Sequence, residues 1–273
     1  MKLHVQHIWP SPQNDRFIGA KMAILYDAQT AMIQSIAGPG VELNVAFNER
    51  SAYYTSCASM EAYNVTGILD ALAAGEAAGC DAALIACGND PGLHAARDAL
   101  RIPVVSATES ALLTACMLGR RFGVITADDA SVALVERNLE SYRLEDRAIR
   151  NRPVRSPGFH EDGTDWVSDP EYLRASVIPR FEDVARGMIE DGADVICTAC
   201  GMYSAFSMHG YAMIGGTEVP VVEAIAAGTH MALMLARLRR DYGVSTSKQR
   251  AYRGIAPELA AQLLAPLRNP GTA

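Results

Sequence analysis

DAALIACGNDPGL, residues 81–93, and DVICTACGMYSAF, residues 194–206, indicate how this chain folds, because they repeat one pattern. Each copy begins at an aspartate that has a glycine two residues before it (Gly79 and Gly192). An apolar run of strand length follows the aspartate, and Cys-Gly ends that run. Pro-Val-Val comes later in both halves, at residues 103–105 and 220–222. A short run without polar alternation is typical of a strand that is buried on both faces of a parallel sheet. The repeat therefore predicts two similar α/β lobes.

Strand-like and helix-like segments alternate along the rest of the chain, as in a parallel α/β fold. The expected strands cover residues 3–8, 41–47, 81–86, 102–107, 120–126, 194–199 and 219–224, and 148–155 is a further candidate. The expected helices cover residues 16–37, 61–79, 94–100, 109–118, 130–141, 170–191 and 225–242. Between them, residues 156–170 are rich in Gly, Pro, Asp and Ser, which predicts a long loop that could cover a site.

From these elements we predict two pseudo-symmetric Rossmann- or flavodoxin-like lobes with parallel sheets and a cleft between them. The first lobe is expected to cover residues 1–118, with residues 225–273 packing back on it. The second is expected to cover residues 119–224. The length of 273 residues suits two such lobes of ordinary domain size.

Composition and charge exclude several classes of protein. Hydrophobic residues make up 49% of the chain and charged residues 20%, so an ordinary buried core is expected. The formal net charge of −7 argues against nucleic acid as a partner. No apolar run is long enough for a membrane span, and the N-terminus predicts a first strand and not a signal peptide. The six cysteines are expected to be reduced thiols in the cytoplasm, because a chain of this size needs no disulfide framework.

Cys87 and Cys200 each follow the apolar strand of one repeat. Ligands of open parallel sheets lie at the carboxyl ends of the strands, and two facing lobes bring these ends together. We therefore expect both thiols to face one cleft from opposite sides. Of the other cysteines, Cys80, Cys116 and Cys197 are predicted to be core residues. Cys57, in the polar stretch AYYTSCAS (52–59), is either a loop residue or part of a pocket.

Two facing thiols suit proton transfer at carbon. A thiolate near a helix N-terminus is expected to have a pKa lowered from its usual value toward neutrality. One thiolate can then take a proton from carbon while the opposite thiol returns one, which is racemisation or epimerisation without a cofactor. Backbone N–H groups of Gly88–Asn89 and Gly201–Met202 are expected to stabilise the enolate. The hydroxyls at positions 106, 108 and 126 either bind substrate or cap helices, and Thr126 is a predicted substrate-binding residue.

No cofactor or metal is expected. Pyridoxal phosphate needs a lysine, and the only lysines are Lys2, Lys21 and Lys248, which lie near the termini and in the first helix. No dinucleotide fingerprint or Walker loop is present, and the six histidines show no metal-ligand spacing. The Cys-x-x-Cys at residues 197–200 is predicted to be neither redox pair nor zinc site, because thiols three residues apart on a strand point to opposite faces.

The motifs resemble the hydantoin and allantoin racemase branch of the aspartate/glutamate racemase superfamily. The resemblance rests on CGNDPGL (87–93) with Arg97, on IPVV (102–105), RFGVIT (121–126) and VPVVEAIAAG (219–228), and on ACGM (199–202). It covers roughly residues 60–240. It implies two pseudo-symmetric α/β lobes, no cofactor, catalytic cysteines at Cys87 and Cys200, and a small carbon acid such as a 5-substituted hydantoin or an amino-acid derivative as substrate.

The chain also departs from this family's pattern. Where the family has an Asn-Pro-Asn-Thr-like segment that binds substrate, this chain has Trp9-Pro10-Ser11-Pro12, so Trp9 and Ser11 are predicted to contact substrate. The second cysteine motif is altered as well. Three alternatives therefore stay open: a maleate-type cis–trans isomerase, an arylmalonate-type decarboxylase, and a non-enzymatic small-molecule-binding protein. The predicted partners are a small-molecule substrate and further copies of the chain in a homo-oligomer.

Overall fold

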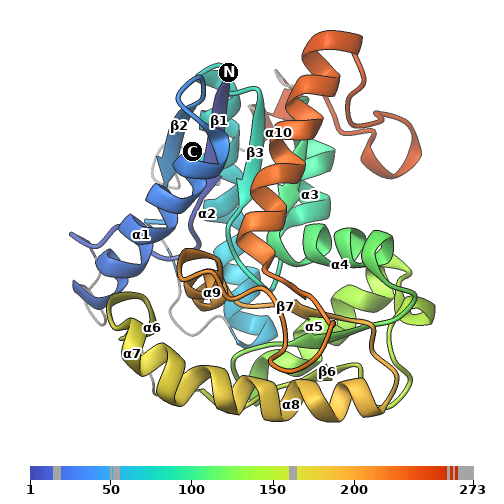
Figure 1. Cartoon of the computed structure of the whole chain (residues 1–273). Helices are drawn as coiled ribbons and strands as arrows, with labels where there is room; N and C mark the ends of the chain where they lie inside the picture. The colour runs from blue at the N-terminus through green and yellow to red at the C-terminus, as the bar shows by residue number, and fades with distance from the viewer. Residues whose placement is uncertain are drawn as a thin grey trace.

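The fold consists of two parallel sheets, each with helices on both faces (Figure 1). The computed structural model describes residues 1–14, 20–49, 51, 56–159, 165–256, 259–260 and 262–263. The strand order is β2-β1-β3-β4 in one sheet and β6-β5-β7-β8 in the other. The two orders are equivalent, and all strands within each sheet are parallel, so the predicted pair of similar α/β lobes is confirmed.

The first lobe alternates strands and helices. Its strands are β1 (Lys2–Gln6), β2 (Glu42–Ala46), β3 (Ala82–Ile85) and β4 (Val104–Ser106). Its helices are α1 (Ala20–Ala37), α2 (Ala58–Ala77), α3 (Leu93–Ala99) and α4 (Ala107–Leu118). The expected helix over residues 16–37 is described only from Ala20, because residues 15–19 lie outside the described ranges.

The second lobe repeats this order with shorter outer strands. Its strands are β5 (Phe122–Ile125), β6 (Val154–Arg155), β7 (Val195–Thr198) and β8 (Val221–Val222). Its helices are α5 (Asp129–Tyr142), α6 (Asp165–Ser168), α7 (Pro170–Tyr172), α8 (Ile178–Glu190) and α9 (Ser204–Met208), and the helix α10 (Ala224–Tyr242) follows its last strand. The described residues also form the short helical turns η1 (Glu145–Arg147), η2 (Leu173–Val177), η3 (Gly201–Tyr203) and, after α10, η4 (Arg250–Tyr252).

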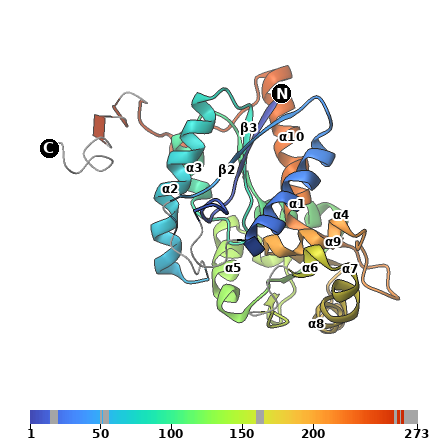
Figure 2. The same ribbon diagram turned by 90° about the vertical axis from the view of Figure 1, so that its left-hand side faces the viewer.

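Apolar side chains divide between the two faces of the first sheet. Ile68 and Leu72 of α2 pack with Ile85 on one face, while Ile33 of α1 and Leu233 of α10 pack with Leu84 on the other. Figure 2 shows α2 and α3 on one side of the strands and α1 and α10 on the opposite side. The core on the α1 side continues through α4 into the second sheet, so one buried cluster joins the lobes.

Helix α10 returns to the first lobe, where it packs against α4, α1, β3 and β4. From these contacts we propose that the lobes divide near residues 118 and 224. No helix in the described ranges has both the length and the apolar character needed to cross a membrane.

The repeated Gly-x-Asp has the same structural role in both lobes. Gly79 and Gly192 follow α2 and α8 with φ of +79° and +96°, a left-handed conformation that glycine adopts without the steric cost of a Cβ. Asp81 accepts a hydrogen bond from Lys2 N at 2.7 Å, and Asp194 accepts one from Arg121 N at 3.0 Å. Each aspartate therefore joins the start of a central strand to the start of its neighbour.

We expect Gly79→Ala and Gly192→Ala each to lower the free energy of unfolding by about 1–2 kcal/mol, because an alanine Cβ strains the left-handed backbone. No atom of the described residues lies within 4 Å of where either alanine Cβ would sit, so the cost is backbone strain and not overpacking. Urea unfolding followed by circular dichroism measures it. Gly40→Ala is the control, since Gly40 has open surroundings and no positive φ. Equal stability of all three variants would contradict the prediction.

Two sequence expectations need correction. The helix expected over residues 170–191 is interrupted, because the wider turn η2 separates α7 from α8. The loop expected over residues 156–170 contains the helix α6, and Phe159 and Trp166 are fully buried in the core of the second lobe. Burial of these two rings overrides the loop-like composition around them. The middle of this segment, residues 160–164, lies outside the described ranges.

Candidate active site

The two repeated cysteines occupy equivalent positions at the carboxyl ends of the central strands. Cys87 lies two residues after the last residue of β3, and Cys200 lies two residues after the last residue of β7. Cys87 is buried and Cys200 is partly buried, and both are free thiols. Both cysteines therefore lie at the strand ends that the repeat predicts, and the cleft that they are expected to share stays a prediction.

The two strand ends meet at a glycine. A Cβ on Gly88 would lie 2.1 Å from the Ala199 carbonyl oxygen and 2.6 Å from the Cys200 nitrogen. The two backbones are therefore so close that no side chain fits between them at this position. Gly201, at the equivalent position, has its nearest backbone neighbour in the Ala86 carbonyl oxygen, 3.8 Å from the corresponding Cβ position. The two cysteine loops therefore form one junction between the lobes.

The pKa values of both thiols differ from expectation. Burial raises the pKa of Cys87 above its ordinary value, the Asn89 N–H opposes this, and the Asp90 carboxyl and the Cys200 thiol raise it further. Burial likewise raises the pKa of Cys200 to about 12. The predicted lowering toward neutrality is wrong, because loss of water at the junction outweighs the helix ends and backbone dipoles.

The backbone N–H groups of Asn89 and Met202 each point at one of the two cysteine sulfurs. Asn89 N lies 3.5 Å from Cys87 Sγ, and the Met202 N–H makes a hydrogen bond that lowers the pKa of Cys200. These donors were expected to stabilise an enolate. In this structure they stabilise the thiolate forms of the two cysteines, which is the state needed to accept a proton from carbon.

The hydroxyls near the strand ends hold the cysteine loops. Thr108 Oγ1 donates to Gly88 O at 2.6 Å, and Thr126 Oγ1 donates to Ala199 O at 3.2 Å. Both threonines are buried. The hydroxyl of Thr126 thus contacts the loop of Cys200, and its role in substrate binding stays a prediction.

The remaining predicted site residues lie around the junction. Trp9 is partly buried and packs against two apolar clusters, one containing Cys87 and the other containing Tyr26. Met202 packs against the Tyr26 cluster as well. Asn89 is buried, and its carbonyl accepts a hydrogen bond from Asn138 Nδ2 at 2.8 Å. Ser11 lies in a turn in which its N–H donates to Glu49 at 3.3 Å, so nothing in its described contacts joins it to either cysteine.

Sequence reasoning missed the side-chain hydrogen bonds that tie the two cysteine loops to neighbouring helices. Asp90 accepts hydrogen bonds from Thr108 N at 2.9 Å, Glu109 N at 2.8 Å and Tyr142 Oη at 2.8 Å, and burial raises its pKa to about 7. Its place in the Asp-Pro-Gly motif was a usable signal for such a role. Gln29 of α1 donates to Gly201 O at 2.6 Å, and its sequence context carries no comparable signal.

The other cysteines are not at the junction loops. Cys80 and Cys197 are buried core residues, as predicted, and Cys116 packs against the core while staying partly exposed. Cys197 Sγ donates to Ala111 O at 3.7 Å, on the face opposite the Cys200 cluster, which confirms the core assignment. Cys57 is the residue before α2, and residues 52–55 of its polar stretch lie outside the described ranges.

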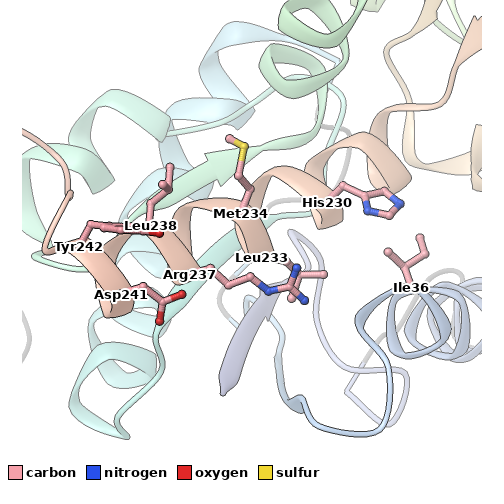
Figure 3. Close-up of a pocket in the computed structure, with 8 residues that line it drawn as sticks. All are labelled: Ile36, His230, Leu233, Met234, Arg237, Leu238, Asp241 and Tyr242. Atoms are coloured by element: carbon pink, nitrogen blue, oxygen red, sulfur yellow. The ribbon is translucent and has the colours of Figure 1, made fainter.

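No group of three His, Cys, Asp or Glu side chains among the described residues is arranged to hold a metal ion. A surface groove between α1 and α10 contains neither catalytic candidate; it is lined by Ile36, His230, Leu233, Met234, Arg237, Leu238, Asp241 and Tyr242 (Figure 3). Ile36 lies at the end of α1, which leads into the start of β2. The groove is therefore near the amino ends of the strands, away from the cysteines.

The fold and the site define a class: two-lobed α/β proteins in which each lobe brings one cysteine to a shared junction. A family model described as Asp/Glu/Hydantoin racemase matches residues 23–232. Two curated hydantoin racemases, from Pseudomonas sp. (strain NS671) and Rhizobium meliloti, are 32% and 33% identical to the chain. The alignments cover 72% and 70% of this chain and 75% and 73% of those proteins.

A solved structure of allantoin racemase from Pseudomonas fluorescens superposes with a TM-score of 0.71 at 25% identity, covering 94% of this chain and 98% of that one. The chain belongs to the Asp/Glu/Hydantoin racemase family. It is accordingly a racemase, an enzyme of the isomerase class.

Proposed function

We propose that this protein racemises a 5-substituted hydantoin or a related cyclic ureide by proton transfer between Cys87, the bound carbon acid and Cys200. The observation that carries the proposal is the contact of Gly88 with the Ala199–Cys200 backbone, which holds the two cysteine loops together at one junction. The chain is similar to proteins named hydantoin racemase and allantoin racemase, and hydantoins and allantoin are cyclic ureides, which supports this substrate class.

In the proposed reaction, one thiolate removes the proton on its side of the substrate carbon, and the electron pair moves to the adjacent carbonyl as an enolate. The thiol on the opposite side then donates its proton to the other face. The roles of the two cysteines reverse for the other enantiomer. A raised thiol pKa makes the thiolate a stronger base, so that its basicity comes nearer to that of a carbanion centre.

The direct experiment uses one pure enantiomer of a 5-substituted hydantoin in deuterium oxide. We expect optical rotation to fall to zero while proton NMR shows loss of the signal at the stereogenic carbon. Allantoin serves as the second substrate. Absence of protein-dependent inversion with both ureides would contradict the proposed substrate class.

Two further assays on the same purified protein distinguish the racemase from the cis–trans isomerase and the decarboxylase. A stable mass increase on one cysteine after incubation with an unsaturated diacid would support the cis–trans isomerase, and release of carbon dioxide from an arylmalonate would support the decarboxylase. Family membership leaves no reason to propose the non-enzymatic binding protein. The homo-oligomer and the cytoplasmic location stay predictions.

We expect kcat/KM for racemisation to rise about tenfold per pH unit between about pH 6 and about pH 9, because both thiols are protonated in this range and the thiolate fraction grows in that proportion. The pKa of Cys200 is raised to about 12 and that of Cys87 is raised as well, so no plateau is expected. The spontaneous rate, measured without protein, is subtracted at every pH. A plateau starting near pH 7 would show that a thiol with a lowered pKa acts as the base.

A further inference from the structure

Gln29 connects the first lobe to the loop that carries Cys200. It lies on α1 and is 1% exposed. Its Nε2 donates to Gly201 O at 2.6 Å and to Ser204 Oγ at 3.2 Å, and both acceptors belong to the second lobe. Because a backbone carbonyl can only accept, the nitrogen end of the carboxamide must face Gly201. The side chain is thus held in one orientation at the lobe junction.

The carbonyls on either side of Cys200 are held from different lobes. Thr126, in the second lobe, donates to the carbonyl before Cys200, and Gln29, in the first lobe, donates to the carbonyl after it. The loop of Cys87 is held by other residues, because Gly88 O accepts from Thr108 of its own lobe and Asn89 O accepts from Asn138 of the second lobe. Among the described residues, the hydrogen bonds of Gln29 reach the loop that carries Cys200 and the helix that follows it, so the position of Cys200 relative to the first lobe depends on Gln29.

We propose that Gln29 is a positioning residue that sets the Cys200 thiol against substrate held at the junction, so that its loss slows proton transfer on the Cys200 face only. The inference rests on the proposed function. Its consequence is an asymmetry between enantiomers. When Cys87 removes the proton, the C–H bond breaks, the electron pair forms the enolate, and the proton passes to Cys87 sulfur. If Cys200 is misplaced, a deuteron from solvent returns through Cys87 to the same face.

The test compares Gln29→Met with Gln34→Met. Methionine has a similar length and no N–H donor. Gln34 is a matched control, because it lies on the same helix and its Nε2 also donates to backbone carbonyls, those of Gly38 and Val41 at 3.0 Å. Cys200→Ser assigns which enantiomer is deprotonated from the Cys87 face. For that enantiomer we expect the ratio of deuterium exchange to inversion to rise about tenfold in Gln29→Met, since a small misplacement of a reacting group has such effects.

For the other enantiomer, exchange and inversion are expected to slow together, and Gln34→Met is expected to match the wild type in both. Ser204→Ala removes the second acceptor of Gln29 and is expected to shift the ratio in the same direction by about threefold, since one hydrogen bond contributes modestly. This variant keeps the test decisive if Gln29→Met does not fold. An equal loss for both enantiomers, with the ratio unchanged, would overturn the positioning role.

A second readout does not depend on catalysis. Iodoacetamide labelling resolved by peptide mass spectrometry is expected to show Cys200 of Gln29→Met reacting at least about threefold faster than in the wild type, because release of the loop exposes the thiol. Labelling of Cys87 is expected to change by less than about twofold. If the wild type racemises no ureide, the proposed function fails while this labelling difference still tests Gln29. Unchanged labelling of Cys200 in a folded Gln29→Met protein overturns the inference.

Discussion

Cys87→Ser and Cys200→Ser are each expected to lower racemisation at least about a thousandfold, because a serine hydroxyl is a far weaker acid than a thiol and forms almost no alkoxide to act as the base at neutral pH. Each variant keeps one thiol beside one face of the substrate carbon. We therefore expect each to retain deuterium exchange without inversion for one enantiomer, and the retained enantiomer to be opposite in the two variants. Polarimetry measures inversion, and proton NMR in deuterium oxide measures exchange.

Cys116→Ser is the matched control, because Cys116 lies on α4 and packs against the core while staying partly exposed. It makes the same chemical change outside the two cysteine loops and is expected to leave racemisation within about twofold of the wild type. Retention of near-normal inversion in either active-site variant would refute the two-cysteine mechanism. Loss of exchange for both enantiomers in one variant would assign both proton transfers to a single thiol.

Gly88→Ala is expected to lower the free energy of unfolding by about 3 kcal/mol and racemisation by about a hundredfold. The added Cβ would lie 2.1 Å from Ala199 O and 2.3 Å from Ala199 C, and a backbone cannot rotate away as a side chain can. The two cysteine loops must then separate. Urea unfolding and polarimetry on the same preparation measure the two effects.

Gly201→Ala is the informative comparison, because it makes the same change at the equivalent position of the repeat. Its Cβ would meet Gln29 Nε2 at 3.2 Å, which a small side-chain movement relieves. We expect a loss of racemisation below about tenfold and a stability change below about 1 kcal/mol. If Gly88→Ala proved as mild as Gly201→Ala, the close approach of the loops would not be required for catalysis.

Much of the fold was predictable because the relevant signals are local. Strands β3 and β7 were expected from apolar runs flanked by Gly-x-Asp and Cys-Gly, and the structure adds that Gly79 and Gly192 take a left-handed conformation after the preceding helix. The segment 156–170 was less predictable, because Phe159 and Trp166 are buried by contacts with distant parts of the second lobe. Its polar composition indicates a loop, while the two rings determine its packing.

The candidate site also has features that local sequence predicts and features that depend on tertiary contacts. The sequence by itself determined that Cys87 and Cys200 lie at equivalent strand ends, since a two-fold repeat of a strand and its following turn places them there whatever surrounds them. Only the tertiary structure decided the pKa values of the two thiols and the hydrogen bonds that hold their loops. Whether a thiol pKa rises or falls depends on how much water the opposite lobe excludes, and whether Gln29 reaches Gly201 depends on how α1 meets a loop 172 residues away in the chain. Both are properties of contacts between lobes, which no local pattern of residues records.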